Sequence, residues 1–200
     1  MSDYDEINEA FEKKLDVMYV GYATSARTFE NVFHRVDWDI FKATDFPHDG
    51  LITYLTKGVS TFLLHTDGKP ENRIRQEFAF TLDEKFGAYD AIADLNSIAD
   101  CALENRFRFA HNEVISYGEF PHLFRPNQSF KFEHFIVASP YWLGDVQRTI
   151  LDDPYPLFVM EIVPLHAGES RLAKENIDAF IELVESEKLD ILDRNRVPAA

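Results

Sequence analysis

Residues 52–82, ITYLTKGVSTFLLHTDGKPENRIRQEFAFTL, decide the fold of this chain. Two stretches rich in Thr, Tyr, Val, Ile and Phe flank a polar segment, and the Asp-Gly-Lys-Pro at 67–70 is typical of a turn. They predict two strands, at about 51–64 and 74–82, that pair as an antiparallel hairpin. Gly58 inside the first strand predicts a bulge or a close approach of another backbone.

The second strand of this hairpin alternates with period two. One face carries Ile74, Gln76, Phe78, Phe80 and Leu82. Arg75 and Glu77 fall together on the opposite face, because side chains two positions apart share a face of a strand. We expect this pair either to face solvent or to meet at a site. An ordinary surface ion pair, worth under about 1 kcal/mol, is the plainer interpretation.

Hydrophobic periodicity places the other elements outward from this hairpin. Helices are predicted at 3–18, 88–106, 167–175 and 177–187, and further strands at 29–42, 113–117, 132–139 and 156–164. Inward-facing stripes are expected from Ile92, Leu95, Ile98, Ala99 and Ala102 on one helix and from Phe180, Ile181 and Val184 on the last. The nearly all-apolar PLFVMEIVP of 156–164 predicts a strand inside the sheet.

Strands and helices in this mixture predict one α+β domain over residues 1–200, with a mixed, mainly antiparallel sheet flanked by helices. Pro47-His48-Asp49-Gly50 predicts a turn before residue 51. Residues 118–130, GEFPHLFRPNQSF, predict a loop rich in proline and aromatic rings. Whether the helix within residues 1–20 packs on its own domain or on a neighbouring copy stays open.

Composition excludes several classes of function. The net charge of −15 disfavours binding to nucleic-acid backbones and favours basic protein partners, although acidity can also serve solubility alone. The 18 phenylalanines predict an aromatic core. The single cysteine, Cys101, forms no intrachain disulfide, and its mid-helix position predicts a buried apolar role. With no apparent signal peptide or apolar membrane span, we expect a cytoplasmic protein.

No pattern of catalytic residues is distinctive. The chain has neither a glycine-rich phosphate loop nor a GxSxG motif, and its histidines lack metal-ligand spacing. His111-x-Glu113 matches half of a zinc-deaminase motif, whose other half needs two cysteines. We therefore expect no enzyme activity, metal or cofactor. A hydrolase that joins Glu77, Glu161 or Glu169 to a histidine is kept as an alternative.

A set of residues spread over 37–196 carries a resemblance to a known family. The residues are Thr53, Tyr54, Gly58 and Ser60, then Arg75 and Glu77, then Pro164, Glu169, Asp178, Ala179 and Phe180. An acid–arginine pair follows, either Asp190 with Arg194 or Asp193 with Arg196. In order and spacing, this pattern resembles the suppressor-of-fused-like domain family, bacterial single-domain type. Asn176 or Ile177 stands where the family has a glycine.

The resemblance implies protein binding rather than catalysis. Eukaryotic relatives clamp zinc-finger transcription factors of hedgehog signalling between two lobes, but this chain is similar only to the first lobe. Bacterial relatives are associated with toxin systems, which implies an acidic immunity protein that neutralises a basic toxin. The candidate partner-binding residues are Arg75, Glu77, Phe120, His122, Phe124 and Arg125. An intracellular adaptor that takes up a peptide by strand addition is the alternative binding role.

Overall fold

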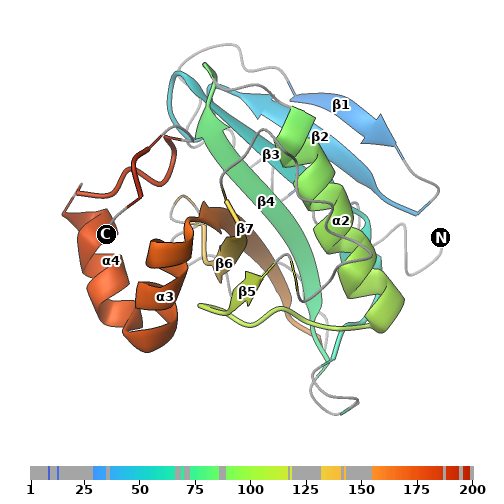
Figure 1. Ribbon diagram of the computed structural model, residues 1–200. Coiled ribbons are helices and arrows are strands. Elements are labelled where there is room, and N and C mark those ends of the chain that lie inside the picture. Colours follow the sequence, from blue (N-terminus) through green and yellow to red (C-terminus); the bar gives the residue numbers. More distant parts are fainter. Residues whose placement is uncertain are drawn as a thin grey trace.

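The computed structural model describes residues 9, 13, 29–34, 37–65, 69, 73–85, 89–116, 118, 132–140, 142, 155–186, 188–193 and 196–198. Its strands are β1 (Phe29–His34), β2 (Asp39–Thr44), β3 (Leu51–Lys57), β4 (Arg75–Asp83), β5 (Val114–Ser116), β6 (His134–Ala138) and β7 (Leu157–Leu165). They form one seven-stranded sheet in the order β1-β2-β3-β4-β7-β6-β5 (Figure 1). Neighbours are antiparallel except β4 and β7, which are parallel. The predicted α+β class with a mixed, mainly antiparallel sheet is confirmed.

Helices cover both faces of the sheet. Helix α2 (Tyr89–Asn105) crosses one face over β3 and β4, and its predicted stripe packs there (Figure 1). Helices α3 (Ala167–Glu175) and α4 (Ile177–Glu185) pack on the other face, against β6 and β7. Because Ile136 and Phe135 are successive residues of β6, they point to opposite faces and belong to these two separate cores.

The hairpin predicted from 52–82 is present. β3 and β4 pair antiparallel, with Tyr54 opposite Phe80. Most of the turn between them lies outside the described residues. The turn predicted at residues 47–50 is confirmed, since Leu51 N donates to His48 O at 3.1 Å. Strand β3 ends at Lys57, earlier than predicted, because the backbone turns at Gly58 into a short 3-10 helix, η1 (Val59–Thr61).

Strand β4 is buried on both faces, which corrects the expectation that one face could be open to solvent. Every residue of β4 except Asp83 is buried. The even-numbered side chains, such as Phe78, face α2, while Ala79 on the opposite side packs with Trp142 and Val159. Period-two alternation marks a half-buried strand only where one face is left uncovered, and here both are covered.

Two further expectations are wrong. Residues 29–42 form two paired strands rather than one, with His34 opposite Asp39 across the hairpin. Both arms are extended, so the sequence pattern alone did not mark the reversal between them. Ile181 is not turned inward: it is 36% exposed, whereas Phe180 is buried and Val184 packs partly buried on the same core.

The predicted phenylalanine-rich core is confirmed. The ring of Phe109 makes edge-to-face contacts with Phe78, Phe107 and Phe135, with centroids 5.5–6.3 Å apart. Cys101 is fully buried, as expected.

The helix expected at 3–18 lies outside the described residues apart from positions 9 and 13. In the described part of the chain, no helix combines the length and apolar character needed to span a bilayer.

Candidate functional site

Glu77 holds the turn that ends β3. Its Oε1 accepts hydrogen bonds from Gly58 N at 2.8 Å and Ser60 N at 2.9 Å, and its Oε2 accepts one from the Thr56 hydroxyl. The side chain is fully buried. Burial raises the pKa of Glu77, and the donors from Thr56, Ser60 and Gly58 act in the opposite direction. The Glu77 carboxylate thus accepts hydrogen bonds from backbone N–H groups at the η1 turn that no neighbouring strand pairs with.

Arg75 binds the backbone carbonyls of the same turn. Its Nη1 donates to Ser60 O at 2.9 Å and to Thr61 O at 3.2 Å, and its guanidinium lies 6.0 Å from the Tyr155 ring centroid. Arg75 is 8% exposed. The solvent-facing alternative for Arg75 and Glu77 is therefore wrong, because both side chains reach inward to the η1 backbone. Their role in partner binding stays a prediction.

Gly58 meets a conformational requirement at this turn. Its φ is 109°, and a Cβ there would lie 2.6 Å from Asp37 O and 2.9 Å from Trp38 Cα. The close backbone approach predicted from the sequence is confirmed.

Thr53, earlier on β3, donates to Phe46 O at 2.9 Å and lies 3.0 Å from the Thr81 hydroxyl.

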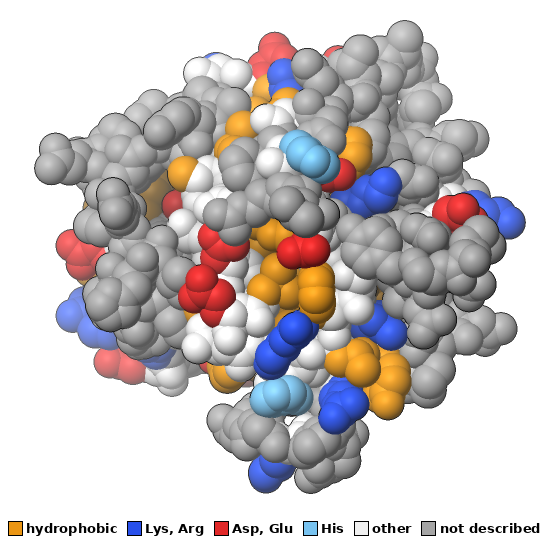
Figure 2. All heavy atoms as spheres, turned by 90° about the vertical axis from the view of Figure 1, so that its right-hand side faces the viewer, with side chains coloured by type: hydrophobic (Ala, Val, Ile, Leu, Met, Phe, Trp, Pro, Cys, Tyr) orange, Lys and Arg blue, Asp and Glu red, His pale blue; other side chains and the backbone are white. Residues whose placement is uncertain are grey.

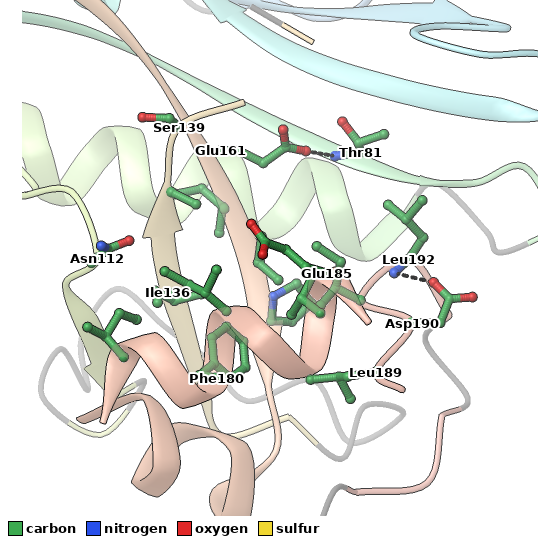
Figure 3. A pocket seen from close by; sticks show the side chains of 18 residues that line it. Thr81, Asn112, Ile136, Ser139, Glu161, Phe180, Glu185, Leu189, Asp190 and Leu192 are labelled. Atoms are coloured by element: carbon green, nitrogen blue, oxygen red, sulfur yellow. Dashed lines mark hydrogen bonds between the residues drawn. The ribbon is translucent and has the colours of Figure 1, made fainter. Parts of the chain in front are cut away.

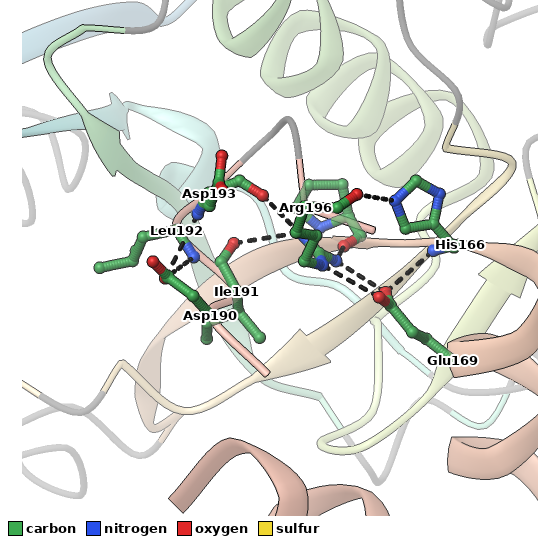
Figure 4. Close-up of polar contacts among 8 residues, drawn as sticks. His166, Glu169, Asp190, Ile191, Leu192, Asp193 and Arg196 are labelled. Atoms are coloured by element: carbon green, nitrogen blue, oxygen red, sulfur yellow. Dashed lines mark hydrogen bonds and ion pairs between the residues drawn. The ribbon is translucent and has the colours of Figure 1, made fainter. Parts of the chain in front are cut away.

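A second buried network joins the C-terminal segment to α3 (Figure 4). Arg196 Nη2 lies 2.7 Å from Glu169 Oε2, and Arg196 Nε lies 3.0 Å from Glu169 Oε1, so the ion pair is bidentate. Arg196 Nη2 also donates to Pro164 O at 2.6 Å. His166 N donates to Glu169 Oε2 at 3.0 Å, and a His166 ring nitrogen contacts Arg196 O.

This network places three residues of the predicted family pattern together: Pro164, Glu169 and one C-terminal arginine. In the Asp193–Arg196 alternative, Arg196 Nη1 donates to the backbone carbonyl of Asp193 at 3.3 Å, and the choice between the two acid–arginine alternatives stays a prediction. Arg194 lies outside the described residues. Burial alone would raise the pKa of Glu169, but the hydrogen bonds from Arg196 and His166 N outweigh it and hold the pKa below its usual value.

A cavity of about 920 Å³ opens between α4, the β6–β7 hairpin and residues 189–192 (Figure 3). Its walls are mainly apolar and include Ile136, Phe180, Ile181, Leu189 and Leu192. Pockets of this size commonly bind ligands or partner side chains. Phe180, a residue of the family pattern, lies at the α4 side of this cavity, whereas Asp178 is exposed.

Three carboxylates line the cavity: Glu161, Glu185 and Asp190. Glu161 lies where the pairing of β4 with β7 ends, and its Oε1 accepts from Thr81 N at 3.1 Å. Burial raises its pKa, which Thr81 and the nearby Trp142 side chain only partly offset. The described lining includes no lysine, arginine or histidine, so the cavity presents a negative, largely apolar surface.

The residues of the hydrolase alternative are not assembled into one site. Glu77 serves η1, and Glu161 has no histidine beside it in the described lining. Glu169 lies beside His166, but its carboxylate is buried and bound by Arg196 through two bonds. At the cavity rim, Ser139 Oγ lies 3.2 Å from His111 Nδ1. No described carboxylate bonds the ring of that exposed histidine, so the orienting third group of a triad is missing there. Within the described residues, no group of three or more potential ligands could hold a metal.

The remaining predicted site residues, Phe120, His122, Phe124 and Arg125, lie outside the described residues and stay predictions. Sequence reasoning missed the wall formed by residues 189–192. Leu189 and Ile191 continue the apolar pattern of α4 beyond its last turn, which is the feature that could have indicated this wall.

Comparison with known proteins identifies the fold class. No protein-family model matches the sequence, and no curated protein matches it at a significant level. The fold is similar to that of a suppressor-of-fused homolog from Neisseria gonorrhoeae, with a TM-score of 0.66 and 18% identity over 96% of both chains. This chain therefore has a suppressor-of-fused-like fold, as the sequence resemblance implied.

Two further structures share this fold. A chain of the Sufu–Fu complex aligns with a TM-score of 0.59 and 14% identity, over 94% of this chain and 91% of that one. Drosophila Suppressor of Fused aligns with a TM-score of 0.56 and 15% identity, over 92% of this chain and 47% of its own. This chain therefore spans about half of the Drosophila protein.

Proposed function

We propose that this chain is a non-catalytic protein-binding domain whose partner is a basic protein. The observation that carries the proposal is the cavity beside α4, which has apolar walls and three carboxylates. The net charge of −15 would draw a basic partner toward the molecule and speed its association. The fold supports a binding role, because a chain of similar fold was crystallised in a Sufu–Fu complex.

The surface charge is not uniform, which supports a localised acidic site. Figure 2 shows acidic, basic and apolar side chains interspersed on the face at the right of Figure 1. The cavity lies instead beside α4, at the left of Figure 1, and its described charged residues are all acidic. A basic side chain of a partner that enters this cavity would therefore meet only acidic groups among the charged residues of the described lining.

The specific role that we propose is an immunity protein that neutralises a cognate basic toxin in the cytoplasm. It would bind tightly over the active surface of the toxin and so block access to its substrate. The bacterial associations of the family resemblance support this role, and the single buried Cys101 agrees with a reducing compartment. Acidic inhibitors reach basic enzymes quickly through electrostatic steering, which suits a protein that must act before damage occurs.

A peptide-binding adaptor is the second candidate. It is favoured by β5, an edge strand of the sheet that pairs only with β6 among the described strands. An extended peptide could add to such an edge through backbone hydrogen bonds. Because backbone pairing carries no net charge, this mode predicts binding that depends weakly on salt, whereas toxin neutralisation predicts strong salt dependence.

Affinity capture from the host lysate tests the binding proposal, and two matched variants locate the interaction. The cavity variant carries Glu161→Gln, Glu185→Gln and Asp190→Asn; the control variant carries Glu104→Gln, Glu133→Gln and Glu175→Gln at exposed positions away from the cavity. Both variants remove three negative charges. We expect the wild type to retain a basic protein at low salt and to release it at high salt.

The toxin role is tested by expressing the captured protein in a host without this chain. Growth arrest that co-expression of the wild type relieves is the expected result. A captured protein that is harmless on its own would remove the toxin role but leave protein binding in place. A captured protein that stays bound at high salt would favour the role of a peptide-binding adaptor.

A further inference from the structure

The cavity exists because strands β4 and β7, which are neighbours in the sheet, stop pairing part of the way along their length. β4 and β7 pair from Arg75 opposite Leu157 as far as Ala79 opposite Glu161. Beyond that point β4 pairs only with β3, and β7 pairs only with β6. Helix α4 and residues 189–192 cover this region without filling it, so the space is a built feature of the fold (Figure 3).

The apolar part of the cavity is partly open to solvent. Ile181 is 36% exposed, and Val197 is the only other large apolar residue exposed to that degree among the described residues. Ile181 borders the cavity together with Phe180 and Leu192. Exposed apolar surface that lines a concavity marks an interaction site more often than scattered surface residues do. This wall suits one or two bulky apolar side chains of a partner.

No lysine, arginine or histidine is among the described residues that line the polar part of the cavity. Glu161 is 6% exposed, and the groups that contact its carboxyl, Thr81 and the Trp142 side chain, are neutral donors. Lys85 attracts Asp190 electrostatically. Its ammonium is ion-paired with Asp83 at 2.8 Å, and Lys85 is not part of the cavity lining. A buried carboxylate that is held only by neutral donors gains more from an incoming cation than an exposed carboxylate does.

From this arrangement we infer that the cavity binds a short apolar–basic segment of the partner protein. A bulky apolar side chain packs against Phe180, Ile181 and Leu192, and a neighbouring lysine or arginine reaches Glu161 or Glu185. The apolar wall excludes water, so that the ion pair forms in a partly desolvated site. The inference rests on the proposed function, because it names the part of the basic partner that this site recognises.

Selection from a random 12-residue peptide display library on the immobilised full chain tests this inference without knowledge of the partner. We expect the selected peptides to share a bulky apolar residue with a lysine or arginine within four positions. Synthetic peptides of the selected sequence should bind the cavity variant at least tenfold more weakly than the wild type and the control variant. Ile181→Lys, an exposed position, should cause a similar loss.

Three results would overturn the inference: no enrichment, enrichment of peptides without a basic residue, or equal affinity for the cavity variant and the wild type. Thermal unfolding of each variant within a few degrees of the wild type shows that a loss is not caused by misfolding. Lysate capture separates this inference from the proposed function. If the cavity variant captures the basic partner as well as the wild type does, binding stands and the cavity assignment fails.

Discussion

The guanidinium of Arg196 and the carboxylate of Glu169 form a buried, two-bond ion pair, with distances of 2.7 and 3.0 Å. Arg196 also donates to the carbonyls of Pro164 and Ile191, so it ties the chain after α4 to the end of β7. Residues 189–192, which precede Arg196, form a wall of the acidic cavity. The ion pair therefore holds in place part of the surface that we assign to partner binding.

Arg196→Met should lower the free energy of unfolding by about 3–5 kcal/mol, because it leaves Glu169 buried without its counter-ion. Urea unfolding followed by circular dichroism measures the loss. Glu169→Gln with Arg196→Met should cost less than the sum of the two single changes, because the pair is coupled. If the two losses add without coupling, the ion pair is not the stabilising contact.

The same pair predicts a dependence of stability on pH. Arg196 and His166 N hold the folded-state pKa of Glu169 below 4.5, so folding favours its ionised form. This contribution is fully present above the unfolded-state pKa and is lost as pH falls through the folded-state pKa. The difference in unfolding free energy between the wild type and Glu169→Gln should shrink from about pH 7 to about pH 3. A difference that stays constant would contradict this account.

Gly58→Ala should destabilise the protein more than Gly50→Ala does. Both glycines have positive φ, at 109° and 79°. A Cβ at Gly50 meets nothing within 4 Å, so only backbone strain of about 1 kcal/mol is expected there. A Cβ at Gly58 would overlap the backbone atoms Asp37 O and Trp38 Cα, so that the turn whose Gly58 N–H binds Glu77 would have to shift. Equal thermal shifts for the two variants would show that the Asp37–Gly58 approach is unimportant.

Cys101 should be unreactive in the folded protein. Burial, reinforced by Glu104 and opposed by Asn105, raises the pKa of its thiol to about 11, and the side chain is fully buried. Thiolate is the reactive form, so an aromatic disulfide reagent at about pH 8 should label it only after urea is added. Rapid labelling without denaturant would mean that α2 opens readily or is packed differently.

Much of the fold could be predicted from local sequence. The turn residues at 67–70 and the two β-rich stretches of 52–82 predicted the central hairpin, and residues 47–50 predicted the turn before it. The apolar stripe on α2 predicted the buried face of that helix. Exposure was harder to predict: Arg75 and Glu77 resemble surface residues in the sequence, yet both are buried. Their partners are backbone groups of η1, which no residue pattern specifies.

The cavity could not be predicted for a related reason. It depends on where β4 and β7 stop pairing, which is fixed by parallel contacts between segments about 80 positions apart. Glu161, Glu185 and Asp190 are three of 35 acidic residues, and only their shared cavity distinguishes them. Ile181 falls in the apolar pattern of α4 but lies at the cavity opening, so periodicity alone assigned it to the core.

The most direct test of the central claim is a binding titration of the captured partner against the wild type and the cavity variant, at low and high salt. We predict tight binding of the wild type at low salt, a steep loss at high salt, and a loss of at least tenfold for the cavity variant relative to the control variant. Binding that is unaffected by salt and equal for both variants would contradict the claim that this domain recognises a basic protein through its acidic cavity.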